Sequence, residues 1–197
     1  MSSSRIFLAR HGLADYETEL VTDDGGSLSV EGRSQARGLA AALRGERISR
    51  VWCSPLSRAV QTAEIAACDL GVDVVVREAL REYGVGALAG TDADESEVIG
   101  PVFGAWAAGD DTATIEGGEA IADIVARMTR VLDDIADQHQ GEAVVVVSHG
   151  GVIMATVPEL LGQPRLSAWD HVLPGGGFIA LDRDGEGWRL NPAHPRR

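Results

Sequence analysis

Short apolar runs alternate along this chain with stretches in which apolar residues recur every three or four positions. A short apolar run is typical of a strand covered on both faces, and the wider spacing is typical of an amphipathic helix. The pattern predicts strands at Ile6–Ala9, Ile48–Cys53, Val72–Val76 and Val144–Val147. It predicts helices after Ser29, from Ser57 to about Cys68, from about Ala120 to Ile135, and over Gly151–Leu161. Strand and helix therefore alternate, as in an α/β fold.

The end of the chain has a different pattern. The segments Phe178–Asp182 and Trp188–Leu190 flank a Gly-rich stretch that is typical of a hairpin turn. The sequence therefore predicts a three-layer α/β sandwich, in which a mostly parallel sheet has helices on both faces and an antiparallel edge. We expect the 197 residues to form one domain, with a loose tail after about Leu190.

Residues able to carry chemistry follow several of the predicted strands. Arg10 and His11 follow the first strand, and His149 follows the last parallel one. Arg58 lies at the start of the helix after the second strand, and Glu82 lies in the loop beyond the third. Functional groups in such sheets gather at the carboxyl ends of the strands. We therefore expect these five residues to share one site.

The residue types in this group favour phosphoryl chemistry. A guanidinium offers a fork of donors that suits phosphate or carboxylate oxygens, and a neutral imidazole is a competent nucleophile. Glycine follows both histidines, as Gly12 and Gly150, and a glycine lets a substrate approach the backbone closely. From the residues alone we predict phosphoryl transfer on a histidine.

Charge and composition exclude some partners. The formal net charge is −13, which argues against nucleic acid and requires any phosphate pocket to be locally basic. No apolar stretch approaches membrane-spanning length, so we expect no membrane partner. Cys53 and Cys68 are the only cysteines, and without an export signal we expect reduced thiols in a cytoplasmic protein.

Five motifs in a fixed order resemble those of the histidine phosphatase superfamily, which is also called phosphoglycerate mutase-like. The motifs are Arg10-His11-Gly12, Ser54–Ala63, Leu80–Gly84, Glu116–Glu119 and Ser148–Gly151. The resemblance extends roughly from Arg5 to Leu190. An Arg-His-Gly tripeptide alone would be a weak signal, whereas the ordered set is a strong one.

The resemblance implies a role for each matching residue. His11 would be the nucleophile that forms a phosphohistidine, and Glu82 would protonate the leaving oxygen and then activate water. The catalytic set would be completed by Arg10, Arg58 and His149. The phosphate-binding residues would be Arg10, His11, Arg58, His149 and Gly150. No metal or other cofactor is implied, and no third ligand stands at metal-binding spacing from the two histidines.

Some assignments stay open in the sequence. The proton donor could instead be Glu78, Glu116 or Glu119. His139, His171 and His194 are expected to be surface or loop histidines. Ser29 is expected to cap a helix rather than to bind phosphate. The glycines at 175–177 are expected to form a turn before the last hairpin.

A short acidic segment, at about 91–118, is expected to cover the site. Its part Thr91–Asp111 has six acidic residues and no Lys or Arg, so it should repel a second phosphate and favour hydrolysis. We therefore predict a metal-independent phosphomonoesterase of the histidine acid phosphatase type, acting on a phosphorylated small molecule. The alternatives are a phosphoglycerate mutase-type phosphotransferase and a non-catalytic binding or regulatory module. The oligomeric state stays open, and a homodimer is one option.

Overall fold

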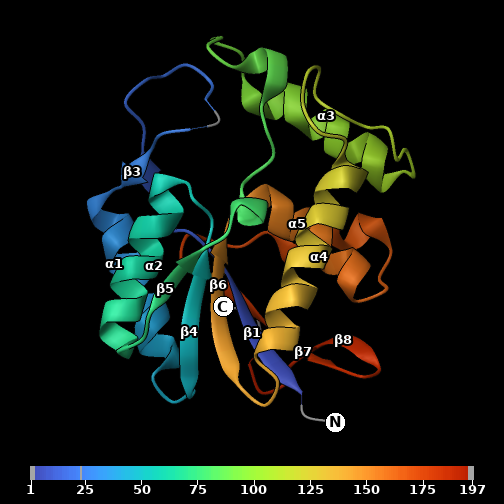
Figure 1. The fold of residues 1–197 in the computed structure, drawn as a ribbon. Coiled ribbons are helices and arrows are strands. Elements are labelled where there is room, and N and C mark those ends of the chain that lie inside the picture. Colours follow the sequence, from blue (N-terminus) through green and yellow to red (C-terminus); the bar gives the residue numbers. More distant parts are fainter. Residues whose placement is uncertain (1–2, 23, 195–197) are drawn as a thin grey trace.

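A six-stranded sheet forms the centre of the protein (Figure 1). The structure, a computed structural model, describes residues 3–22 and 24–194, apart from the side chains of residues 95 and 96. The sheet order is β5–β4–β6–β1–β7–β8. Its strands are β1 (Ser4–Arg10), β4 (Ile48–Cys53), β5 (Val74–Val76), β6 (Ala143–Ser148), β7 (Phe178–Asp184) and β8 (Gly187–Leu190). The strands from β5 to β1 run parallel, and β7 and β8 form the antiparallel edge, which confirms the predicted fold class.

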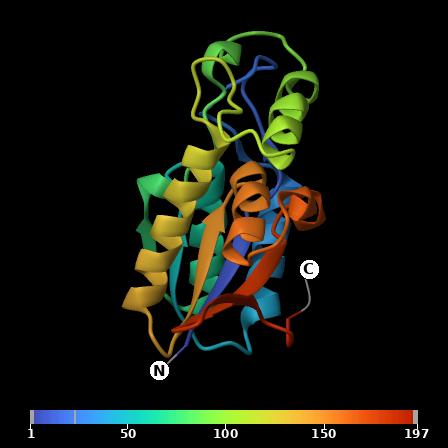
Figure 2. The same ribbon diagram turned by 90° about the vertical axis from the view of Figure 1, so that its right-hand side faces the viewer.

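Helices cover both faces of the sheet (Figures 1 and 2). The helices α1 (Val30–Leu43) and α2 (Ser57–Leu70) pack on one face, and α4 (Ile121–Gln138) and α5 (Gly150–Leu160) pack on the other. Successive strand residues point to opposite faces. In β1, Phe7 contacts the α1 and α2 side, whereas Ile6 and Leu8 contact the α4 and α5 side. This double burial explains why β1 is a continuous apolar run.

Strand β6 lies between β4 and β1 and is the most buried strand. Its residues Val144–Val147 are fully buried, which confirms the strand that the sequence predicts there. The predicted turn before the last hairpin is also confirmed, with Gly176 at φ +72°. Ser29 caps α1, because its side chain accepts the backbone N–H of Gly32. Both cysteines are free, Cys53 buried and Cys68 exposed.

Several elements lie outside the main sheet. They are β2 (Ala14–Asp15), β3 (Ser27–Leu28), the short 3-10 helices η1 (Glu78–Leu80), η2 (Gly86–Leu88) and η3 (Arg165–His171), and the helix α3 (Glu95–Ala107). Helix α3 belongs to the segment that the sequence predicted only as an acidic cover. It forms because Ile99, Phe103 and Trp106 recur at helical spacing and bury one face. It lies beyond the carboxyl ends of the parallel strands (Figure 2). Among the described helices, none combines the length and the apolar character needed to cross a membrane.

The expectation of a loose tail after Leu190 is wrong for the residues up to His194. Asn191 is buried, and its side-chain amide donates to the Asp182 carboxylate over 2.9 Å. The His194 ring packs edge-on against Phe7, with ring centroids 5.2 Å apart. These contacts, together with the hydrogen bond from the Asn191 N–H to the Ala180 carbonyl, hold the chain against β7 and β1. Residues 195–197 lie outside the described part of the chain.

His139 lies in the turn after α4 and His171 lies in η3, and both are buried, so the expectation of surface positions is wrong for these two. The Nε2 of His139 accepts the indole N–H of Trp52 over 3.1 Å. Its Nδ1 lies 2.7 Å from the Glu142 carboxylate. These histidines satisfy buried polar partners, which a local sequence pattern does not show. His194 is half-buried and pairs with Glu46.

Candidate active site

The two histidines meet at the carboxyl end of the sheet because their strands are neighbours. In the parallel β1–β6 ladder Arg10 pairs with Ser148, and the next backbone N–H, that of His11, donates to the Ser148 carbonyl over 3.0 Å. His149 follows directly and is the N-cap residue of α5. The rings of His11 and His149 have centroids 5.1 Å apart. The sheet register thus places two imidazoles side by side.

The His11 ring is oriented by its own loop. Its Nδ1 lies 2.7 Å from the Gly12 carbonyl oxygen. A carbonyl only accepts, so Nδ1 carries the proton and Nε2 keeps its lone pair. Burial lowers the pKa of His11 to about 4, opposed by the Gly12 hydrogen bond and aided by the nearby Arg58 and Arg10 charges. His11 is therefore neutral at neutral pH, as a nucleophile must be.

His149 is fully buried beside His11. Its Nε2 lies 2.7 Å from the Ser54 hydroxyl, and that hydroxyl also accepts the backbone N–H of Leu56 over 3.2 Å. Its Nδ1 has no hydrogen-bond partner among the described residues. Burial and the nearby positive charges hold the pKa of His149 well below its usual range. Ser54, to which the sequence analysis gave no role, thus orients the second histidine from the end of β4.

Arg10 and Arg58 lie near both histidines and have no carboxylate partner among the described residues. Arg58 is buried, and Arg10 is half-buried. Each makes one side-chain hydrogen bond to a backbone carbonyl, from Arg10 to Leu173 over 2.8 Å and from Arg58 to Gly25 over 3.0 Å. The Nε of each guanidinium is buried and has no partner in the described structure. Two guanidinium charges that lack a carboxylate partner attract an anion strongly.

A cavity of about 310 Å³ opens onto these groups. Five of the six expected site residues line it, namely Arg10, His11, Arg58, Glu82 and Gly150. The sixth, His149, is fully buried and does not line it. Of the two glycines expected to admit substrate, Gly150 lines the cavity, whereas Gly12 makes room for protein. A Cβ on Gly12 would lie 2.5 Å from the Gly32 carbonyl oxygen in α1. A Cβ on Gly151 would lie 2.2 Å from the Tyr83 ring. These glycines permit close packing around the site.

Glu82 occupies the N-terminus of α5. Its carboxylate accepts the backbone N–H groups of Gly151 over 3.1 Å, of Val152 over 3.0 Å and of Tyr83 over 3.2 Å. Burial raises the pKa of Glu82, although these three hydrogen bonds and the Arg58 charge act in the opposite direction. A carboxyl group with a raised pKa that shares a cavity with a neutral imidazole fits a proton donor.

The other three candidate carboxylates are placed differently. Glu78, Glu116 and Glu119 are exposed. Glu78 pairs with Arg81 over 3.0 Å, and Glu119 pairs with Arg127 over 2.9 Å. None of the three lines the cavity that contains His11, whereas Glu82 does.

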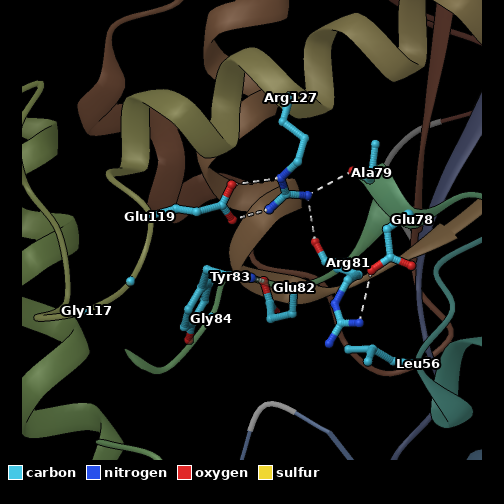
Figure 3. Close-up of a pocket in the computed structure, with 11 residues that line it drawn as sticks. Leu56, Glu78, Ala79, Arg81, Glu82, Tyr83, Gly84, Gly117, Glu119 and Arg127 are labelled. Carbon is cyan, nitrogen blue, oxygen red and sulfur yellow. Dashed lines mark hydrogen bonds and ion pairs between the residues drawn. The ribbon is translucent and has the colours of Figure 1, made fainter. Parts of the chain in front are cut away.

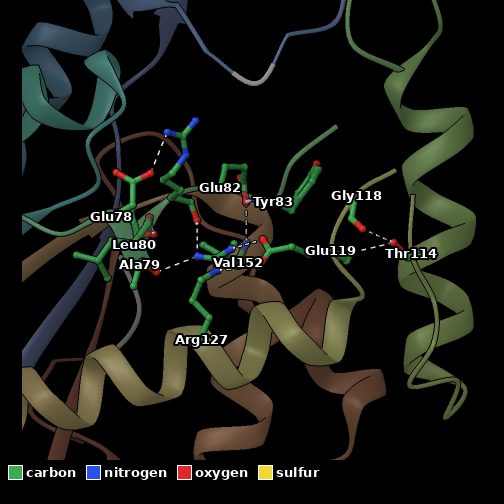
Figure 4. A network of polar contacts seen from close by, with 12 residues as sticks. Glu78, Ala79, Leu80, Glu82, Tyr83, Thr114, Gly118, Glu119, Arg127 and Val152 are labelled. Carbon is green, nitrogen blue, oxygen red and sulfur yellow. Dashed lines mark hydrogen bonds and ion pairs between the residues drawn. The ribbon is translucent and has the colours of Figure 1, made fainter. Parts of the chain in front are cut away.

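Arg127, which the sequence analysis did not single out, holds the segment that precedes Glu82 (Figure 4). One of its guanidinium nitrogens donates to the carbonyls of Ala79 over 2.8 Å and Arg81 over 3.1 Å. The other two nitrogens donate to the Glu119 carboxylate over 3.2 and 2.9 Å. The sequence feature that could have pointed to Arg127 is its position directly before Met128, beside the buried apolar stripe of α4.

A second cavity of about 690 Å³ adjoins the first and shares Glu82 and Tyr83 with it (Figure 3). Its charged lining residues are Glu78, Arg81, Glu82, Glu119 and Arg127. The described acidic side chains of Thr91–Asp111 line neither cavity. Asp111, for example, is exposed and pairs with Arg165 over 2.7 Å. The expected repulsion from an acidic cover therefore has no support in these positions, and the carboxylates near the site come from other segments.

Comparison with known proteins agrees with this geometry. The model of the histidine phosphatase superfamily (branch 1) matches residues 6–193. Phosphoglycerate mutase-like protein 4 of Arabidopsis thaliana is 37% identical over 195 residues, covering 95% of this chain and 83% of the plant protein.

Two solved phosphatase structures have the same fold. The mycobacterial glucosyl-3-phosphoglycerate phosphatase matches with a TM-score of 0.78 and 27% identity, over 96% of this chain and 97% of that one. The alpha-ribazole phosphatase of Shigella flexneri matches with a TM-score of 0.76 and 25% identity, over 95% of this chain and 94% of that one. On the match over nearly its whole length, this chain belongs to the histidine phosphatase superfamily.

Proposed function

We propose that the protein is a phosphomonoesterase that hydrolyses a phosphorylated small molecule through a phosphohistidine on His11. One observation carries this proposal. The neutral His11 shares one cavity with two guanidinium groups, those of Arg10 and Arg58, that have no carboxylate partner among the described residues. A phosphoryl group supplies the missing negative charge and places its phosphorus within reach of the imidazole.

In the first step, His11 Nε2 attacks the phosphorus atom of the monoester. An N–P bond forms, and the bond between phosphorus and the leaving oxygen breaks. Glu82 gives its proton to that oxygen, so the product that departs is a neutral alcohol. The raised pKa of Glu82 supports this role, because the carboxyl must hold a proton before the step.

In the second step, water attacks the phosphohistidine. The Glu82 carboxylate takes the proton from the water, a P–O bond forms, and the N–P bond breaks. Phosphate leaves, and both His11 and Glu82 return to their starting states. Arg10, Arg58, His149 and the backbone at Gly150 would bind the phosphoryl oxygens in both steps.

We propose further that the two guanidinium charges, those of Arg10 and Arg58, take the place of a metal ion. Phosphoryl transfer depends mainly on positioning and charge stabilisation, which two arginines and a buried imidazole supply. Activity is then expected to be the same with and without a chelator such as EDTA. A loss of activity that an added divalent cation restores would contradict this part of the proposal.

The substitution His11→Ala tests the mechanism. Turnover of a monophosphate ester should be abolished, and radiolabelled phosphate should no longer be trapped on the protein in an acid-labile form. His194→Ala serves as the control, because this half-buried histidine contacts Phe7 and Glu46 away from the cavity. Near-normal hydrolysis by the His11 variant, with its fold intact by circular dichroism, would refute the proposal.

A phosphoglycerate mutase-type transfer is the second candidate function, and the named similarity to phosphoglycerate mutase-like protein 4 favours it. A mutase must keep its phosphohistidine from water and retain a bisphosphate intermediate. Incubation with one phosphoglycerate isomer and a trace of bisphosphate separates the two. A hydrolase releases as free phosphate whatever phosphoglycerate it turns over, however slowly, whereas rapid isomer interconversion with little free phosphate would establish the mutase.

A further inference from the structure

The chemistry of the cavity walls indicates which monoesters the site accepts. We propose that the leaving group is a neutral alcohol with an apolar part and that esters with a carboxylate or a second phosphate are poor substrates. This inference rests on the proposed function, because it treats the cavity around His11 as the place where a phosphate ester binds.

The first observation is the rim of the 310 Å³ cavity. Outside the groups that face the phosphate and the proton donor, its described lining consists of apolar or neutral side chains and Gly151. The side chains are Tyr16, Thr22, Tyr83, Val85, Met154 and Val172. Apolar and aromatic walls with a few polar groups at the base are typical of a small-molecule site. This rim fits an alkyl or aromatic group and provides no counterion for an anion.

The second observation is the charge of the adjoining 690 Å³ cavity, into which a longer leaving group extends past Glu82. Its two cations are already engaged (Figures 3 and 4). Arg127 binds the Glu119 carboxylate and two carbonyls. Arg81 pairs with Glu78 and with Asp24 over 2.8 Å. Three carboxylates, including Glu82, line this space beside those two arginines. An anionic substituent here meets repulsion rather than a free counterion.

A third cavity of about 280 Å³ adjoins the rim at Tyr16 and Thr22. Its described lining contains one charged side chain, that of Glu19, and it is negative. The rim and the two adjoining cavities, which are the spaces open to a leaving group, therefore have neutral or acidic walls. A carboxylate moved from water to such a place loses hydration without gaining a partner, so the binding of an anionic leaving group is disfavoured.

Three substrates with alcohol leaving groups test the inference on the wild-type protein. They are benzyl phosphate, glycerol 3-phosphate and 3-phosphoglycerate. The last two share a carbon skeleton and differ by a hydroxymethyl group in place of a carboxylate. We expect kcat/KM to fall in the order given, with about a tenfold or greater drop between glycerol 3-phosphate and 3-phosphoglycerate. Equal values for the last pair, or a preference for the carboxylate, would overturn the inference.

The substitution Val172→Arg adds a cation to the rim. Val172 lines the 310 Å³ cavity and is 59% exposed, so an arginine fits there without entering the core. We expect the ratio of kcat/KM for 3-phosphoglycerate to that for glycerol 3-phosphate to rise about fivefold. Taking the ratio cancels any general effect on phosphate binding. An unchanged ratio would contradict the inference.

Leu166→Arg is the matched control. Leu166 lies in η3, six residues before Val172, is 68% exposed, and lines none of the three cavities. It changes the net charge by the same amount, so the ratio should stay at the wild-type value. The inference and the proposed function fail differently. No phosphate release from any of the three esters would count against the function, whereas release with a preference for anionic leaving groups would count only against the inference.

Discussion

The cavity has two sides that are built in different ways. The side that would bind the phosphate consists of residues at the ends of β1, β4 and β6 and at the starts of α2 and α5, so the sheet ladder fixes their positions. The side that would bind the leaving group carries Glu82 on a segment outside the sheet. That segment is held by the N-terminus of α5 and by Arg127.

The two sides also differ in charge. The phosphate side has two guanidinium groups without carboxylate partners in the described structure, whereas the leaving-group side has carboxylates and paired arginines. In the proposed mechanism, charge stabilisation therefore comes from residues that the sheet positions, and proton donation and substrate choice come from the part outside the sheet. A change on the phosphate side should therefore affect every monoester equally, and a change on the other side should depend on the leaving group.

Apart from the loss of His11 itself, Arg58→Ala is expected to have the largest effect. Loss of one charged donor from such a site typically lowers kcat by about 10²–10³. The decrease should be equal for benzyl phosphate and 4-nitrophenyl phosphate, because Arg58 would act on the phosphoryl group common to both. Phosphate release is the measurement, and Arg37→Ala, an exposed arginine on α1, is the control. A change in KM alone, or unequal losses for the two esters, would contradict the assignment of Arg58 to the phosphate side.

Glu82→Gln should discriminate between the same two esters. The benzyl alkoxide needs a proton to leave in the first step, so we expect kcat/KM for benzyl phosphate to fall about 10²-fold. The nitrophenyl oxygen leaves with little protonation, and kcat/KM for 4-nitrophenyl phosphate should change far less. The comparison uses kcat/KM because it reports on the first step alone, whereas loss of the base in the second step would lower kcat for both esters. Equal losses would assign Glu82 a structural role and would reopen the assignment of the acid.

The pH profile checks the same residue independently. Wild-type kcat/KM for benzyl phosphate should rise as pH increases through the pKa of His11, which burial lowers to about 4, because His11 must be neutral. It should fall as pH increases through the raised pKa of Glu82, because the carboxyl must be protonated. The fall at higher pH should disappear in Glu82→Gln.

Arg127→Met should have a smaller effect of the same kind. Without the guanidinium, the carbonyls of Ala79 and Arg81 lose their donor, and Glu82 is positioned less accurately. We expect kcat/KM, which reports on the first step, to fall about tenfold for benzyl phosphate and to stay nearly unchanged for 4-nitrophenyl phosphate. Arg130→Met, at an exposed position of the same helix, is the control. Equal losses for both esters would show that Arg127 supports the fold rather than Glu82.

The smallest expected effect concerns stability in acid. The pKa of His11 is lowered in the folded protein, so the stability that it contributes is present above an unfolded pKa of about 6.5 and is lost as pH falls toward 4. Between pH 7 and 5 this should amount to about 2 kcal/mol of the free energy of unfolding. Urea titrations of the wild type and of His11→Gln measure it, and an equal acid loss in both would contradict the assignment.

Much of the fold could be predicted because strand patterns are local. The four consecutive valines Val144–Val147 predict a buried strand, and β6 lies in the middle of the sheet. Helix α3 was missed because its acidic start conceals the apolar spacing from Ile99 to Trp106. The buried state of His139 depends on Trp52, which lies 87 positions away, so no local pattern reports it.

By itself, the sequence determined the strands, the helices that alternate with them and the positions of Arg10, His11, Arg58 and His149 at strand and helix ends. Each of these follows from neighbouring residues and from the rule that parallel strands end at one edge. Only the tertiary structure decided which carboxyl group lies beside His11, since Glu82 is held there by Gly151, Val152 and the Arg127 contacts. The tertiary structure also decided the charge around the leaving group. Both depend on contacts between residues far apart in the chain, and such contacts exist only when the layers have packed.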